Sequence, residues 1–153
     1  MRNGLTLIEL MVVMAIIALL SGGGLAAYTS FNQSQTLKAA AENLKNNLRL
    51  VQSRALSQEK PATGCTVLDG FRVDIGVGTS NYSHLALCNG DIPLEASRQS
   101  FPPLPAGVTF ASANPNQVIF RLLGSGATTA AITVAGFGKA PITINISQGG
   151  EIY

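Results

Sequence analysis

An uncharged stretch of 28 residues, Leu10–Leu37, lies near the start of this chain of 153 residues. Arg2 and Glu9 are the only charged residues before Lys38. The apolar part of this region, residues 5–28, would be about 36 Å long as a helix, and the hydrocarbon core of a bilayer is about 30 Å thick. The sequence therefore predicts a transmembrane helix over residues 5–28.

The low charge content of the chain limits the classes of protein that fit it. Charged residues make up 12% of the chain, about half of the usual share. The net charge is +2, which is too small to indicate a nucleic-acid partner. The chain has two cysteines and one histidine, which do not supply a zinc site. We therefore expect neither a metal nor a cofactor.

Glu9 is a carboxylate at the edge of the apolar run. An acidic side chain in a membrane helix costs about 2.5 to 3.5 kcal/mol at the bilayer centre and less near its ends, so Glu9 needs a partner or a function. The alternative for an apolar N-terminus is a Sec signal peptide, cut here after Ala26, which would make the chain a secreted protein such as a hydrolase. Glu9 counts against that alternative.

The residues around Glu9 resemble a known processing motif. Gly4-Leu5-Thr6-Leu7-Ile8-Glu9 is similar to the prepilin cleavage motif of type IV pilins and type II secretion pseudopilins. The resemblance implies that a prepilin peptidase removes a leader, residues 1–4, by cutting between Gly4 and Leu5. It also implies N-methylation of Leu5, although most family members have phenylalanine there, so the methylation stays open.

The same resemblance gives Glu9 a role in assembly. In the family, this glutamate is thought to pair with the terminal amine of a neighbouring subunit, and joint burial of an amine and a carboxylate is tolerable where burial of either alone is not. Major pilins usually carry a proline within the apolar run, where this chain has Gly22-Gly23-Gly24. These glycines indicate either a flexible joint or close helix packing.

Residues 29–60 are expected to continue the helix with an amphipathic pattern. Six apolar residues are spaced alternately by four and three, which predicts one buried face: Leu37, Ala41, Leu44, Leu48, Val51 and Ala55. Pro61 marks the end of this segment because proline cannot continue a helix. Lys38, Lys45 and Arg49 fall near one face, as a solvated surface or as a binding patch.

Residues 61–153 read as a β-rich head. Seven short runs bounded by glycine, asparagine and proline are predicted strands: Thr66–Leu68, Phe71–Ile75, His84–Cys88, Val108–Phe110, Val118–Leu122, Ala131–Val134 and Ile142–Ile146. Glycine pairs at residues 124–126 and 136–138 suggest hairpin connections. The predicted fold is α+β and pilin-like, with a long N-terminal helix, half transmembrane and half amphipathic, packed on an antiparallel β-sheet.

The head resembles the GspH/FimT family of minor pilins and pseudopilins. The resemblance is carried by Leu104–Val108, by Asn116–Phe120 before a glycine turn, and by Gly149–Ile152 after the last strand. If the head lies in the periplasm, Cys65 and Cys88 are expected to form a disulfide, with two buried free thiols as the alternative. His84, the single histidine, is expected to be structural or at the surface, and no catalytic constellation is present, so we do not expect an enzyme.

The sequence therefore predicts a minor structural subunit of a type IV pilus or a type II secretion pseudopilus. Its expected partners are a prepilin peptidase and other pilin or pseudopilin subunits. The expected location is the inner membrane, as a single-pass protein with a periplasmic head, and then the filament. The alternative is a FimT-like minor pilin that binds DNA for transformation, but the tail from Gln148 to Tyr153 has no basic residue, which disfavours it.

Overall fold

The computed structural model describes residues 6–153, without the side chains of residues 19–26. The chain divides into two compact units, Met1–Gln35 and Thr36–Tyr153. Helix α1, Leu7–Leu56, contributes to both units and is helical through Gly22–Gly24. Within the described residues, no helix combines the length and the hydropathy that crossing a membrane requires.

Helix α1 ends at Leu56, four residues before the expected end at Lys60. The N–H of Glu59 donates to the carbonyl of Arg54 over 3.1 Å, and the N–H of Gln58 donates to the carbonyl of Ala55 over 3.3 Å. Gln58 has a left-handed backbone conformation, with a φ of 53°. These two bonds form a Schellman motif, which satisfies the last helical carbonyls and turns the chain out of the helix before Pro61.

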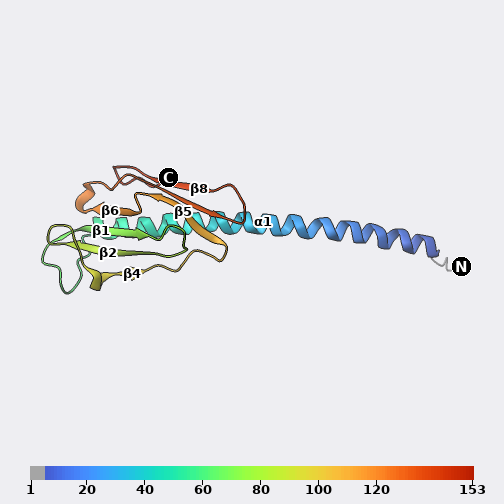
Figure 1. Ribbon diagram of the computed structural model, residues 1–153, viewed down its shortest axis with the longest axis horizontal. Coiled ribbons are helices and arrows are strands. Elements are labelled where there is room, and N and C mark those ends of the chain that lie inside the picture. Colours follow the sequence, from blue (N-terminus) through green and yellow to red (C-terminus); the bar gives the residue numbers. More distant parts are fainter. Residues whose placement is uncertain (1–5) are drawn as a thin grey trace. The chain divides into compact units, whose positions relative to one another are not determined.

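The head, within the second unit, contains two antiparallel sheets. The larger sheet has the strand order β3-β2-β1-β6, and β4 also pairs with β2. Its strands are β1 (Leu68–Ile75), β2 (Tyr82–Cys88), β3 (Ile92–Pro93), β4 (Gln99–Ser100) and β6 (Gln117–Arg121). A short 3₁₀ helix, Glu95–Ser97, lies between β3 and β4. Figure 1 shows β1, β2 and β4 along one side of the helical segment of this unit.

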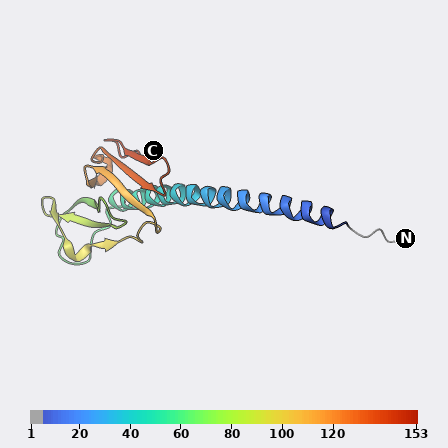
Figure 2. The same cartoon turned by 45° about the vertical axis from the view of Figure 1, so that its right-hand side comes forward.

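The smaller sheet has the order β5-β7-β8. Its strands are β5 (Val108–Asn114), β7 (Ala130–Gly136) and β8 (Ile142–Ile146). In the view of Figure 2, the orange and red strands of this sheet appear mostly above the helical segment. The green and yellow strands of the larger sheet appear below it. The second unit is therefore a helical segment whose apolar face packs against two antiparallel sheets, which confirms the predicted α+β fold with antiparallel strands on the helix.

The core of the head is built on the apolar face of α1. All six residues of the predicted heptad face are at most 2% exposed, and Ala40 is also buried. Side chains from both sheets join the same cluster, among them Val73, Phe110 and Phe120. Both sheets thus bury their inner faces against the same face of the helical segment.

Three details of the predicted strands and turns can be compared with the structure. The predicted strand Thr66–Leu68 is not a separate strand. Only Leu68 of this run is in a strand, and it is the first residue of β1, which continues to Ile75. The glycines at 136–138 join the paired strands β7 and β8, as a hairpin requires. Those at 124–126 lie in a turn that is closed by a bridge between Phe120 and Ala127, after which the chain crosses from one sheet to the other.

Candidate assembly site

Thr6 and Glu9 form the start of α1. The N–H of Glu9 donates to the Thr6 carbonyl over 3.1 Å and is 3.4 Å from the Thr6 hydroxyl, Oγ1. Thr6 is therefore the N-cap, and Glu9 occupies the third helical position, as in a capping box. A carboxylate in the first turn is stabilised by the partial positive charge of the helix N-terminus. The spacing Thr-x-x-Glu is a sequence signal that predicts this cap, although the resemblance to the processing motif alone does not.

The segment around Glu9 exposes apolar side chains. Glu9 itself is exposed, with Ile8 71% and Leu10 54% accessible. Further exposed apolar residues follow on the same segment: Met11, Val12, Val13, Met14, Ile16 and Ile17. A continuous apolar surface of this kind marks a site of contact with another protein or with a membrane. Gly4 and Leu5, the predicted cleavage and methylation residues, lie outside the described residues.

The disulfide Cys65–Cys88 ties the segment after the helix to the end of β2. The two Cα atoms are 5.4 Å apart, and 23 positions separate the residues in the sequence. Beside this disulfide, the side-chain oxygen of Asn89 accepts the N–H groups of Thr66 and Val67 at 3.1 and 2.9 Å. The segment that leads from α1 into β1 is therefore fixed by both a covalent bond and hydrogen bonds.

Polar side chains of α1 bind the head at its margins. The Asn47 amide donates to the Tyr82 hydroxyl over 2.6 Å, and the Gln52 amide donates to the Gly150 carbonyl over 2.8 Å. Arg49 donates to the carbonyl of Ile152 over 3.4 Å, while Lys45 pairs with Glu42 over 3.3 Å. Of the three cations considered as a binding patch, Arg49 thus has a partner in the head and Lys45 has one on α1 itself, and the contact with the head favours a structural role for Arg49.

His84 is a buried residue of the helix-facing side of β2, 3% exposed. Its Nε2 accepts a hydrogen bond from Nη1 of Arg54 over 2.7 Å, and its ring stacks on Phe101 with centroids 4.8 Å apart. Burial, and then the Arg54 charge, lower the pKa of His84 below its ordinary value. The ring is therefore a neutral structural contact between the end of α1 and the sheet.

Arg72, Arg98 and Arg121 pair with carboxylates of the head. Asp74 binds Arg72 and Arg98, each over 2.8 Å, and Arg98 also binds Glu95 over 2.7 Å. Arg121 pairs with Asp91. The hydrogen bond from Arg98 lowers the pKa of Glu95. Among the described residues, no group of three or more metal-binding side chains is found.

A capped N-terminal helix with an exposed carboxylate and apolar surface, continued by a helical segment whose apolar face packs against two antiparallel sheets, defines a pilin-like subunit. Residues 1–25 match the prokaryotic N-terminal methylation motif. Residues 40–150 match the family described as type II transport protein GspH. The chain belongs to this GspH family.

Solved structures agree with the fold. A structure of the minor pseudopilin EpsH from the type II secretion system of Vibrio cholerae is 15% identical, with a TM-score of 0.55, and covers 76% of this chain and 94% of that chain. A crystal structure of the same pseudopilin is 14% identical, with a TM-score of 0.53, and covers 78% of this chain and 92% of that one. No curated protein matches the chain.

Proposed function

We propose that the chain is a minor pseudopilin that enters the pseudopilus of a type II secretion system through its N-terminal helix. The observation that carries the proposal is the methylation motif over residues 1–25 at the start of α1, whose later turns form the core of a GspH head. A prepilin peptidase would cut between Gly4 and Leu5 and expose the amine of Leu5. The GspH family favours the secretion machine over a type IV pilus.

Before assembly, the apolar segment 5–28 would hold the chain in the inner membrane with the head in the periplasm. The absence of charge from Leu10 to Leu37 supports this arrangement, because a charged side chain in hydrocarbon is costly. The disulfide Cys65–Cys88 is in keeping with a periplasmic head, since disulfides persist in oxidising compartments.

During assembly, Glu9 would pair with the terminal amine of an adjacent subunit. Glu9 is exposed on the helix, so its carboxylate is accessible to a partner from outside the chain. A buried carboxylate without its partner is strongly unfavourable, and the pair therefore fixes the position of one helix against the next.

The test compares Glu9→Ala with Glu42→Ala in cells that make the full secretion machine. Glu42 is an exposed α1 residue whose surface pair with Lys45 contributes little, so it is the matched control. We expect both variants to be cut to a mature chain that begins at Leu5, as measured by mass spectrometry. Only Glu9→Ala should be lost from sheared pseudopili, and its normal incorporation would refute the assembly role.

A further inference from the structure

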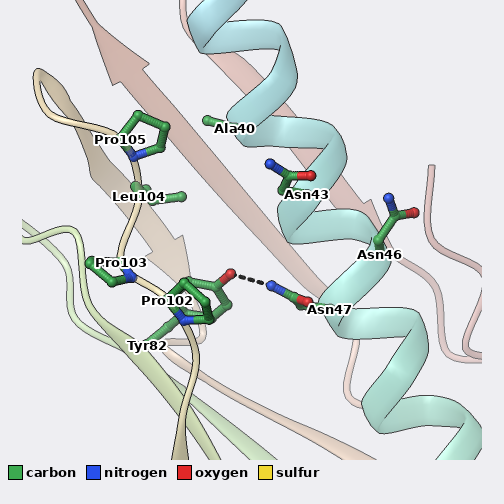
Figure 3. A pocket seen from close by; sticks show the side chains of 9 residues that line it. All are labelled: Ala40, Asn43, Asn46, Asn47, Tyr82, Pro102, Pro103, Leu104 and Pro105. Carbon is green, nitrogen blue, oxygen red and sulfur yellow. Dashed lines mark hydrogen bonds between the residues drawn. The ribbon is translucent and has the colours of Figure 1, made fainter.

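A groove of about 320 Å³ lies between α1 and the segment Phe101–Pro105, which we call the proline strap. Figure 3 shows the groove with the strap on one side and the helix on the other. Its lining comes from α1, from β2 and from the strap: Ala40, Asn43, Asn46, Asn47, Tyr82, Pro102, Pro103, Leu104 and Pro105. All of these residues belong to the second unit.

The proline strap is held firmly at two positions. The N–H of Phe101 donates to the Tyr82 carbonyl over 3.1 Å, and the N–H of Leu104 donates to the Ser80 carbonyl over 2.9 Å. Phe101 also stacks on Tyr82 with centroids 4.9 Å apart, and Leu104 is 6% exposed. Pro102, Pro103 and Pro105 are exposed. Their rings are therefore accessible to a partner, while the hydrogen bonds of Phe101 and Leu104 hold the backbone in place.

The groove floor is equally fixed. Tyr82 is 5% exposed, its ring meets Phe110 edge-on, and its hydroxyl accepts the hydrogen bond from Asn47. Figure 3 shows this bond between the helix and the base of the strap, with Asn43 pointing from the helix toward the strap. The groove is thus formed before any partner arrives.

The chemistry of the lining selects an uncharged partner. None of the described residues that line the groove is charged. Proline has no N–H, so the strap offers apolar rings and carbonyl oxygens, whereas Asn43 and Asn46 offer amide groups. A charged side chain placed here would lose water without gaining a counter-charge. An aromatic ring, by contrast, can pack against the prolines, and a hydroxyl group on that ring, as in tyrosine, can exchange a hydrogen bond with the amides.

We propose that this groove receives the N-terminal helix of a neighbouring pilin-like subunit, through an uncharged helix face that carries an aromatic side chain. This inference rests on the proposed function and adds the partner surface on the head. The chain shows the complementary surface itself: Tyr28 and Phe31 are 68% and 63% exposed on α1. They are three residues apart and share one helix face, within the uncharged stretch Leu10–Leu37.

The groove and the exposed face of the helix match in their lack of charge. Both surfaces lack charge, so their contact requires no desolvation of an ion. An aromatic ring also buries a large area with little loss of conformational entropy, which makes aromatic residues common anchors at interfaces. The groove is therefore suited to one ring of the partner helix, with the asparagine amides at its margin.

The first test places a photocrosslinking amino acid at Asn43 in the full chain, in cells that make the whole machine. The control position is Lys38, which is exposed on α1 and lies about 140° around the helix from Asn43. We expect Asn43, but not Lys38, to crosslink to a peptide from the uncharged part of the first helix of a pilin-like subunit. A crosslink to a head, a crosslink to another class of protein, or no crosslink would overturn the proposal.

The second test compares Asn43→Asp with Asn43→Ser, at an exposed position where a surface substitution usually changes stability little. The aspartate adds a charge in nearly the same shape, and the serine stays neutral. We expect Asn43→Asp to lower incorporation into sheared pseudopili at least about tenfold and Asn43→Ser to stay within about threefold of the natural chain. Equal incorporation of the two variants would overturn the proposal.

The outcomes separate this inference from the proposed function. If the natural chain is processed and incorporated but Asn43 gives no helix crosslink, the groove proposal fails and the proposed function stands. If the natural chain is neither cut at Leu5 nor found in pseudopili, the proposed function fails and the groove proposal fails with it.

Discussion

Arg54, in the last turn of α1, donates a hydrogen bond to Nε2 of His84 over 2.7 Å. Arginine can only donate, so Nε2 accepts and the neutral ring carries its proton on Nδ1, a buried atom without a hydrogen-bond partner in the described part of the chain. Glu59 and Lys60 are the other charged residues at this site. The contact joins the end of the helix to β2 only while the imidazole is neutral.

We expect the stability of the head to fall as the pH decreases below about 6.5, the ordinary pKa of histidine. Burial and Arg54 lower the pKa of His84 in the folded chain. Above pH 6.5 the ring is neutral in both states, but below it the unfolded chain binds a proton that the folded chain resists. Thermal unfolding of the purified chain at a series of pH values measures this effect. The variant His84→Gln should show a smaller decrease over the same range, and identical slopes would contradict the assignment.

We expect removal of the disulfide to lower the free energy of unfolding by about 3 kcal/mol, because Cys65 and Cys88 close a loop of 23 positions. The measurement is chemical denaturation of Cys65→Ser/Cys88→Ser against the oxidised natural chain. The reduced natural chain is the control and should match the double variant. A reduced chain as stable as the oxidised one would show that the bond does not constrain the head.

We expect Leu44→Ala to destabilise the head by about 2 to 5 kcal/mol, since Leu44 is fully buried in the core between the helix and the sheets. Leu50, on the same helix, is 43% exposed. Leu50→Ala should therefore change the stability by no more than about 0.5 kcal/mol. Denaturation curves of the two variants give both values, and similar losses would mean that the two positions are not distinguished by burial.

The periodic parts of the fold could be predicted from the sequence. The heptad spacing identified six helix residues that are all buried, and the run Ile142–Ile146 coincides with β8. Both succeed because burial of one face imposes a period that is visible in a single segment. The family resemblance likewise identified the N-terminal motif and the GspH-type head, which the methylation match over residues 1–25 and the GspH match over residues 40–150 support.

The parts that depend on distant contacts could not be predicted. The division of the strands into two sheets depends on which strands meet across the helix. The short strands β3 and β4 have two residues each, too few for a period. The groove required the proline strap to lie beside Asn43, and nothing in either segment indicates the other. The buried position of His84 likewise follows from its pairing with Arg54, 30 residues away.

The end of α1 at Leu56 could not be predicted from the sequence for a local reason. Gln58 occupies the left-handed position of the Schellman motif, with a φ of 53°, where glycine is the usual residue. A side chain costs about 1 kcal/mol in this conformation, and glycine avoids that cost. We therefore expect Gln58→Gly to raise the free energy of unfolding by up to about 1 kcal/mol, measured by denaturation. Gln58→Ala keeps the Cβ atom and should bring no gain, so an equal increase in both variants would trace the effect to the loss of the glutamine side chain instead of to the backbone.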